Sequence, residues 1–133
     1  MTLKISRALA DQMTAHCLRH YPKEACGLLA GTQGVVEQVY PMTNVEDSPI
    51  GYSMDPQEQL EVEKQMRQLG QQTIGIYHSH TASEAYPSSV DVGLAISPDI
   101  SYVLVSLQRR AAPVVKSFRI DGSTVTPEEV VQV

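Results

Sequence analysis

The sequence predicts an α/β (α+β) domain built on a mixed β-sheet that is flanked by helices. Three segments carry helix signals and five short segments are apolar and β-branched. They follow one another in the order α-β-β-α-β-α-β-β, which is typical of a sheet covered by helices. With 133 residues, of which 42% are hydrophobic, the chain has the size and composition of one folded domain, which we assign to residues 1–133.

The first three elements are a helix and two strands. A helix is predicted over Ser6–Tyr21, because apolar residues recur at intervals of four, Ser6 is a suitable N-cap and Pro22 follows its end. The apolar runs Cys26–Ala30 and Val35–Tyr40 predict two strands. The glycine-containing segment between them predicts a hairpin turn.

A loop and a second helix come next. The segment Pro41–Met54 contains Asn, Asp, Ser, Gly and two Pro residues, so we interpret it as a surface loop. Asp55 is a suitable N-cap, Pro56 occupies the first helical position, and Glu58 completes the pattern of a capping box. Gly70 is expected to end this helix.

The last part of the chain predicts three strands and a short helix. Thr73–His80 is β-branched and alternating, and we expect it to be a central strand. A helix start near Pro87 predicts a short helix to about Ile96. Ser101–Leu107 and Val114–Ile120 predict two more strands, and residues 123–133 show no pattern that predicts an element.

Charge and composition exclude several classes of function. The net charge is −5, the ten Lys and Arg are dispersed, and the chain has no Trp and one Phe, so nucleic-acid binding has no support. No stretch approaches the ~18 apolar residues of a membrane span, and the first residues lack the apolar core of a signal peptide. We therefore expect a cytoplasmic protein without membrane contact, in which Cys17 and Cys26 are reduced.

The motif with the clearest chemistry is His78-Ser79-His80. Residues i and i+2 of a strand point to the same face, so both imidazoles can reach one ion. Asp91, at the start of the next helix, adds a carboxylate, which gives a His, His, Asp set. Three protein ligands leave the fourth position of zinc open for water, as in catalytic zinc sites. The same ligands can also hold non-haem iron.

Hydrolysis at such a site needs a general base and a donor for the developing oxyanion. The Ser88 hydroxyl, one helical turn before Asp91, is a candidate donor. For the base, the spacing leaves several acids open, among them Glu24, Glu37, Glu46 and Glu84. Glu24 stands out because it lies between a helix and an apolar strand, where a carboxylate is seldom buried.

These motifs together resemble the JAMM (MPN+) metalloprotease family. That family's pattern is a glutamate, then His-x-His, about seven to ten residues, and Ser-x-x-Asp. The chain has Glu24 before Cys26–Gly31, then His78-Ser79-His80 and Ser88-x-x-Asp91, in that order. One departure is Thr81, which stands after the second histidine where family members commonly have proline and which bears on loop geometry rather than on metal binding.

The resemblance implies a fold, a site and a substrate class. The fold would be a curved mixed sheet similar to that of cytidine deaminases. His78, His80 and Asp91 would bind one Zn²⁺, Glu24 would be the general acid/base, and Ser88 would stabilise the oxyanion. The compact form resembles prokaryotic members that hydrolyse a peptide or isopeptide bond at the extended C-terminal tail of a small ubiquitin-like or sulfur-carrier protein. We expect the Pro41–Met54 loop to form one wall of the groove for that tail.

Two other functions remain open at this point. The first is a non-catalytic MPN-like binding scaffold, although such proteins usually lack one or more ligand positions and this chain has all of them. The second is a zinc hydrolase that acts on a small amide. A deaminase fits poorly, because no Pro-Cys-x-x-Cys follows the histidines.

Overall fold

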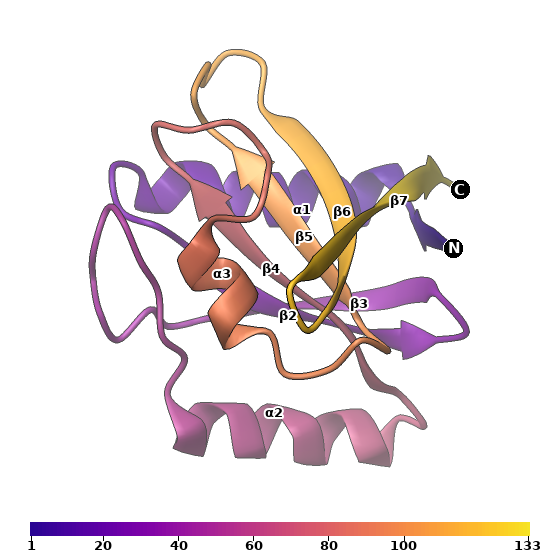
Figure 1. Cartoon of the computed structure of the whole chain (residues 1–133). Helices are drawn as coiled ribbons and strands as arrows, with labels where there is room; N and C mark the ends of the chain where they lie inside the picture. Colours follow the sequence, from indigo (N-terminus) through magenta and orange to yellow (C-terminus); the bar gives the residue numbers. More distant parts are fainter.

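A closed, mixed β-sheet forms the centre of the protein (Figure 1). The computed structural model describes residues 1–133. The strands hydrogen-bond in the order β1-β3-β2-β4-β5-β6-β7, and β1 pairs with both β3 and β7, so the sheet closes on itself. The pairs β4–β5, β1–β3 and β1–β7 are parallel and the others are antiparallel. The prediction of a mixed sheet flanked by helices is confirmed, with β4 in the middle.

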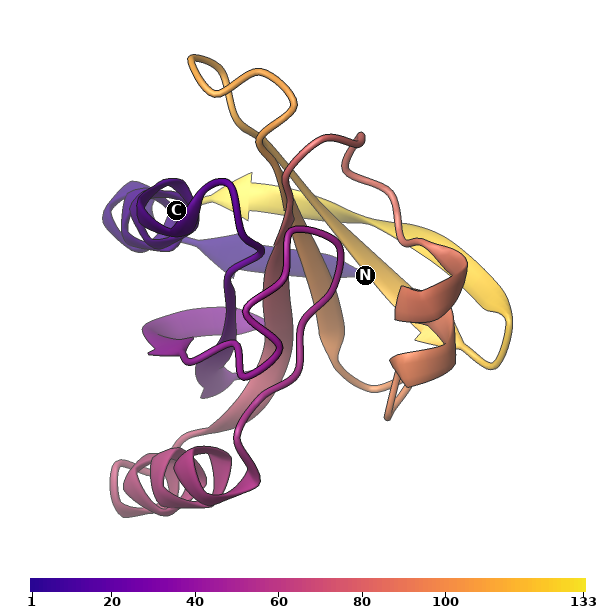
Figure 2. The ribbon, with the colours of Figure 1, turned by 90° about the vertical axis from the view of Figure 1, so that its left-hand side faces the viewer.

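The elements follow the order β1-α1-β2-β3-α2-β4-α3-β5-β6-β7. The strands are β1 (Thr2–Ile5), β2 (Cys26–Thr32), β3 (Val35–Met42), β4 (Gln72–His80), β5 (Ser101–Ser106), β6 (Val114–Asp121) and β7 (Thr124–Gln132). The helices are α1 (Arg7–His20), α2 (Pro56–Gln68) and α3 (Ser89–Leu94). Figure 2 shows α1 and α2 on one side of β4 and α3 on the other. No helix combines the length and the apolarity that crossing a bilayer requires.

The helix boundaries confirm the predicted caps with one exception. The Ser6 hydroxyl accepts a hydrogen bond from the Leu9 amide at the start of α1, and Asp55 accepts one from the Gln57 amide at the start of α2. The prediction of a capping box at α2 is wrong, because Glu58 instead accepts hydrogen bonds from the amide and the hydroxyl of Thr43. Glu58 thereby ties α2 to the end of β3 rather than to its own first turn.

Two strands were missed, and they are the ones that close the sheet. β1 has four residues, which is too short for a periodic signal, and β7 contains Pro127, which is unusual within a sheet. Their pairing joins the two ends of the chain in parallel, from Thr2 opposite Glu129 to Ile5 opposite Gln132. No local pattern encodes a contact between residues so far apart in sequence.

Alternate residues of the central strands point into two separate parts of the core. Leu29 and Tyr77 pack with Met13 and other residues of α1, whereas Leu28 and Ile76 pack with Met66 of α2 and others. Because side chains alternate along a strand, His78 and His80 lie on the same face of β4 as Ile76. The apolar packing on both faces therefore fixes the direction in which the two imidazoles point.

Candidate metal centre

The ends of β4 and α3 bring His78, His80 and Asp91 together. The Nε2 atoms of the two histidines lie 3.3 Å apart. Asp91 places Oδ1 3.2 Å from Nε2 of His78 and Oδ2 3.0 Å from Nε2 of His80. All three candidate ligand atoms lie within 4.8 Å of one another, so the three side chains form a group that can hold a metal ion.

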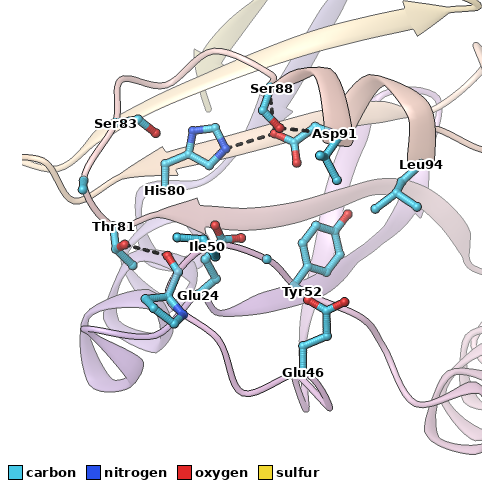
Figure 3. A pocket seen from close by; sticks show the side chains of 14 residues that line it. Glu24, Glu46, Ile50, Tyr52, His80, Thr81, Ser83, Ser88, Asp91 and Leu94 are labelled. Carbon is cyan, nitrogen blue, oxygen red and sulfur yellow. Dashed lines mark hydrogen bonds and ion pairs between the residues drawn. The ribbon is translucent and has the colours of Figure 1, made fainter.

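Neighbouring groups hold each of these side chains in its orientation. His80 Nδ1 lies 2.9 Å from the Glu84 carbonyl, to which it donates, so that its Nε2 is directed at Asp91 (Figure 3). The ring of Tyr52 stacks on His78 with 4.6 Å between ring centroids. The carboxylate of Asp91 accepts the Ser88 amide at 2.9 Å.

The capping box of α3 explains why Asp91 reaches the histidines. Ser88 is the N-cap, and its hydroxyl accepts a hydrogen bond from the Asp91 amide at 3.1 Å. Asp91 returns the contact by accepting the Ser88 amide, so the first turn of α3 is fixed at both positions. Ser88 and Asp91, predicted at a spacing of one helical turn, are thus held side by side.

Burial and mutual contacts shift the pKa values of all three side chains. Burial raises the pKa of Asp91, but hydrogen bonds with His78 and His80 outweigh it and hold that pKa well below its usual range. Burial lowers the pKa of His78 despite the nearby Asp91. Burial also acts to lower the pKa of His80, but its contacts with Asp91 and the Glu84 carbonyl raise it.

The donor set fits a metal ion better than it fits a proton. Three electron-pair donors face one point, and a proton on one of them cannot satisfy the other two contacts. A single cation at that point satisfies all three. Two imidazoles and one carboxylate are a ligand set of catalytic zinc sites.

Glu24 is buried beside this group. The residue is 7% exposed, and its carboxylate receives no hydrogen bond from the protein. Burial raises the pKa of Glu24 from 4.5 to about 7, with His80 opposing the rise and Asp91 and Glu46 adding to it. A carboxyl group with this pKa can both accept and return a proton near neutral pH.

A cavity of about 520 Å³ opens in front of these residues (Figure 3). His80, Asp91, Ser88 and Glu24 all line it. Its other walls include Pro49–Tyr52, which belong to the loop that was expected to flank a substrate groove. Besides Asp91, α3 contributes the apolar side chains of Val90 and Leu94.

Residues 6–121 match the family model described as prokaryotic homologs of the JAB domain. This chain belongs to the prokaryotic JAB family. The match spans both histidines, Asp91, Ser88 and Glu24, and the JAMM/MPN resemblance inferred from the motifs is confirmed.

Known relatives agree with that assignment. The chain is 47% identical over 130 residues to the CysO-cysteine peptidase of Mycobacterium tuberculosis, which covers 96% of this chain and 89% of the relative. The solution structure of protein DSY2949 from Desulfitobacterium hafniense superposes with a TM-score of 0.90 at 42% identity and covers 100% of this chain and 93% of that one. AF2198 from Archaeoglobus fulgidus, a JAB1/MPN domain protein, shares the fold with a TM-score of 0.62 at 20% identity and covers 98% and 100% of the two chains.

Sequence reasoning missed two residues that support this JAB site without being candidate metal ligands. Tyr52 stacks on His78 from a loop in which no spacing rule marks it. Ser79 has its hydroxyl on the opposite face of β4, where it accepts the Ala25 amide at 2.9 Å and holds the segment next to Glu24. Its position between two histidines on an alternating strand was the one available signal that it faces away from them.

Proposed function

We propose that this chain is a zinc-dependent metallopeptidase that cleaves the bond after the C-terminus of a small ubiquitin-like or sulfur-carrier protein. The observation that carries the proposal is the convergence of His78, His80 and Asp91 beside Glu24, a buried carboxylate without a protein donor. The M. tuberculosis relative, a CysO-cysteine peptidase by name, aligns along nearly the whole chain and supports the substrate class.

His78, His80 and Asp91 are the proposed zinc ligands. They would hold the ion through three side-chain atoms, at a point beside the cavity that substrate and water can enter. When bound, zinc would act as a Lewis acid and make hydroxide available near neutral pH. The Glu84 carbonyl and the Tyr52 ring keep the two imidazoles in their ligating orientation.

Glu24 is the proposed general acid/base. Its carboxylate accepts a proton from the attacking water and then delivers that proton to the nitrogen of the leaving amine. A pKa of about 7 suits both steps, because the group is neither permanently charged nor permanently neutral at physiological pH.

Ser88 is the proposed oxyanion donor. Its Oγ accepts the Asp91 amide, which uses a lone pair and leaves the hydroxyl proton free. That proton can be donated to the carbonyl oxygen of the scissile bond as negative charge develops on it. The N-cap contact holds Oγ in place for this role.

The cavity fits an extended tail better than a folded surface. Its lining is formed by the Pro49–Tyr52 segment on one side and by α3 on the other, which leaves room for a narrow chain between them. The presence of all ligand positions speaks against the scaffold alternative. The cytoplasmic location and the single domain over residues 1–133 stay predictions.

The test is a cleavage assay with three substrates: a sulfur-carrier protein extended by a C-terminal cysteine, the same carrier joined to a lysine side chain, and a small acyl amide. We expect the zinc-loaded protein to cleave a carrier conjugate and to spare the small amide. Glu24→Gln should keep its zinc and lose activity by about 10²- to 10⁴-fold, because the proton relay is gone.

Two results would contradict the proposal. Cleavage of the small amide alone would move the function to the small-amide hydrolase. Glu24→Gln turnover close to that of the unchanged protein would remove Glu24 from the mechanism.

A further inference from the structure

The backbone groups of Glu24 itself bond to a loop, whereas those of the next residue, Ala25, bond to Ser79 of β4. Its amide donates to the Ser48 carbonyl at 2.9 Å, and its carbonyl accepts Nδ2 of Asn44 at 3.0 Å. Both partners lie in the connection between β3 and α2, residues 43–55. The amide and the carbonyl of Glu24 are therefore both positioned by this connection, which we name the Asn44 loop.

Asn44 uses its whole side chain to build the loop. Besides Glu24, its Nδ2 donates to the Gly51 carbonyl at 3.0 Å. Its Oδ1 accepts the amides of Glu46 at 3.1 Å and Ser53 at 3.0 Å. The two N–H groups of Nδ2 and the two lone pairs of Oδ1 thus pair with four separate backbone groups. Only a carboxamide of this length offers both donors and acceptors.

A second contact holds the outer part of the Asn44 loop. The Thr81 hydroxyl donates to the Pro49 carbonyl at 2.9 Å, a contact that Figure 3 draws beside the cavity. Thr81 follows directly on the ligand His80 and stands where the family commonly has proline, which has no hydroxyl. The loop is thus tied to β4 as well as to Glu24.

We propose that the Asn44 loop is a clamp that positions the Glu24 carboxylate for proton transfer, with Asn44 and Thr81 as positioning residues. The proposal rests on the function proposed above. Proton transfer requires the carboxylate within hydrogen-bond reach of the reacting atoms, and a misplacement of about 1 Å can cost about 100-fold in rate. Neither residue contacts the metal ligands through its side chain, so the loss should appear in kcat and not in metal content.

The first variant is Asn44→Asp, which has the same shape, keeps both acceptor contacts and loses both donors. We expect kcat for the carrier conjugate to fall about 100-fold, with KM within about twofold and zinc content unchanged. The matched control is Ser117→Ala, which also removes a buried hydrogen bond, 2.7 Å from Ser117 to Glu128, but has no contact with the loop. This control should keep kcat.

The second variant keeps the test decisive if Asn44→Asp fails to fold. Thr81→Val removes one hydroxyl at the partly exposed edge of the loop, and we expect it to lower kcat about tenfold while zinc stays bound. Thr81→Ser restores the donor and should restore kcat. If the methyl group of Thr81 mattered only for packing, Thr81→Ser would not restore kcat, because serine lacks that methyl group.

The outcomes separate the clamp from the function it serves. Asn44→Asp and Thr81→Val with kcat near that of the unchanged protein would overturn the clamp, and so would a loss of kcat that matches a loss of zinc. If the unchanged, zinc-loaded protein cleaves none of the conjugates, the proposed function fails instead.

Discussion

Glu24 and Glu128 are equally buried, and yet their carboxyl groups are expected to ionise in opposite ways. Each residue as a whole is 7% exposed. Glu128 lies where β5, β6 and β7 meet and accepts hydrogen bonds from Ser101 at 2.6 Å, Ser117 at 2.7 Å and Arg119 at 2.8 Å. Glu24 lies beside the metal centre and accepts none.

The hydrogen-bond donors around each carboxyl group, and not its burial, decide the direction in which its pKa shifts. Burial acts to raise the pKa of both carboxyl groups. At Glu128 the two serine hydroxyls and the Arg119 guanidinium reverse that effect and lower the pKa, whereas at Glu24 nothing does and the pKa rises to about 7. A buried carboxylate with all its donors supports the fold, and one without them is free to exchange a proton.

The largest effect expected from this comparison is on the way the unfolding free energy of the metal-free protein changes with pH. Between about pH 4.5 and pH 7, Glu24 binds a proton in the folded chain but not in the unfolded one, so its contribution to stability falls as pH rises. The total loss is about 3 kcal/mol. Glu24→Gln removes this dependence, so its stability relative to the unchanged protein should increase with pH.

Urea unfolding of both proteins from pH 4.5 to 7.5 in the presence of a chelator measures that difference. His16, whose pKa burial lowers to about 4, has the opposite slope, because it is neutral in the folded chain and charged in the unfolded one below pH 6.5. His16 is present in both proteins, so its effect cancels. A difference that stays constant with pH would show that Glu24 titrates normally.

A smaller effect is expected at Glu128. Glu128→Gln keeps the shape but loses the charge that Arg119 pairs with, and the NH2 group of its amide faces other hydrogen-bond donors, so we expect a loss of about 2 kcal/mol in unfolding free energy. The lowered pKa of Glu128 means that its contribution is present above its ordinary pKa and fades as pH falls. Zinc content and kcat should not change. A variant as stable as the unchanged protein at pH 7 would contradict the structural role.

The sequence predicted those parts of the site that depend on short-range geometry. His78 and His80 share a face because a strand alternates, and Asp91 adjoins Ser88 because a capping box joins residues three apart. The same reasoning predicted eight of the helices and strands, which carry their own periodicity or capping residues.

The remaining features depend on contacts between distant segments. β1 and β7 exist as a pair that joins the two ends of the chain, and neither has a strong pattern of its own. Spacing left several acids open as the base, because Glu24 is positioned by a contact with Asn44, twenty residues later in the sequence. Tyr52 was missed for the same reason, since its ring reaches His78 only in the folded chain.

The most direct test of the metal centre is the metal content of the purified protein, measured by elemental mass spectrometry beside Asp91→Asn and Glu24→Gln. We expect about one zinc per chain in the unchanged protein and in Glu24→Gln, and none in Asp91→Asn, which loses one of three ligands. No bound metal in the unchanged protein after zinc is supplied, or equal zinc in Asp91→Asn, would contradict the assignment of His78, His80 and Asp91 as the metal centre.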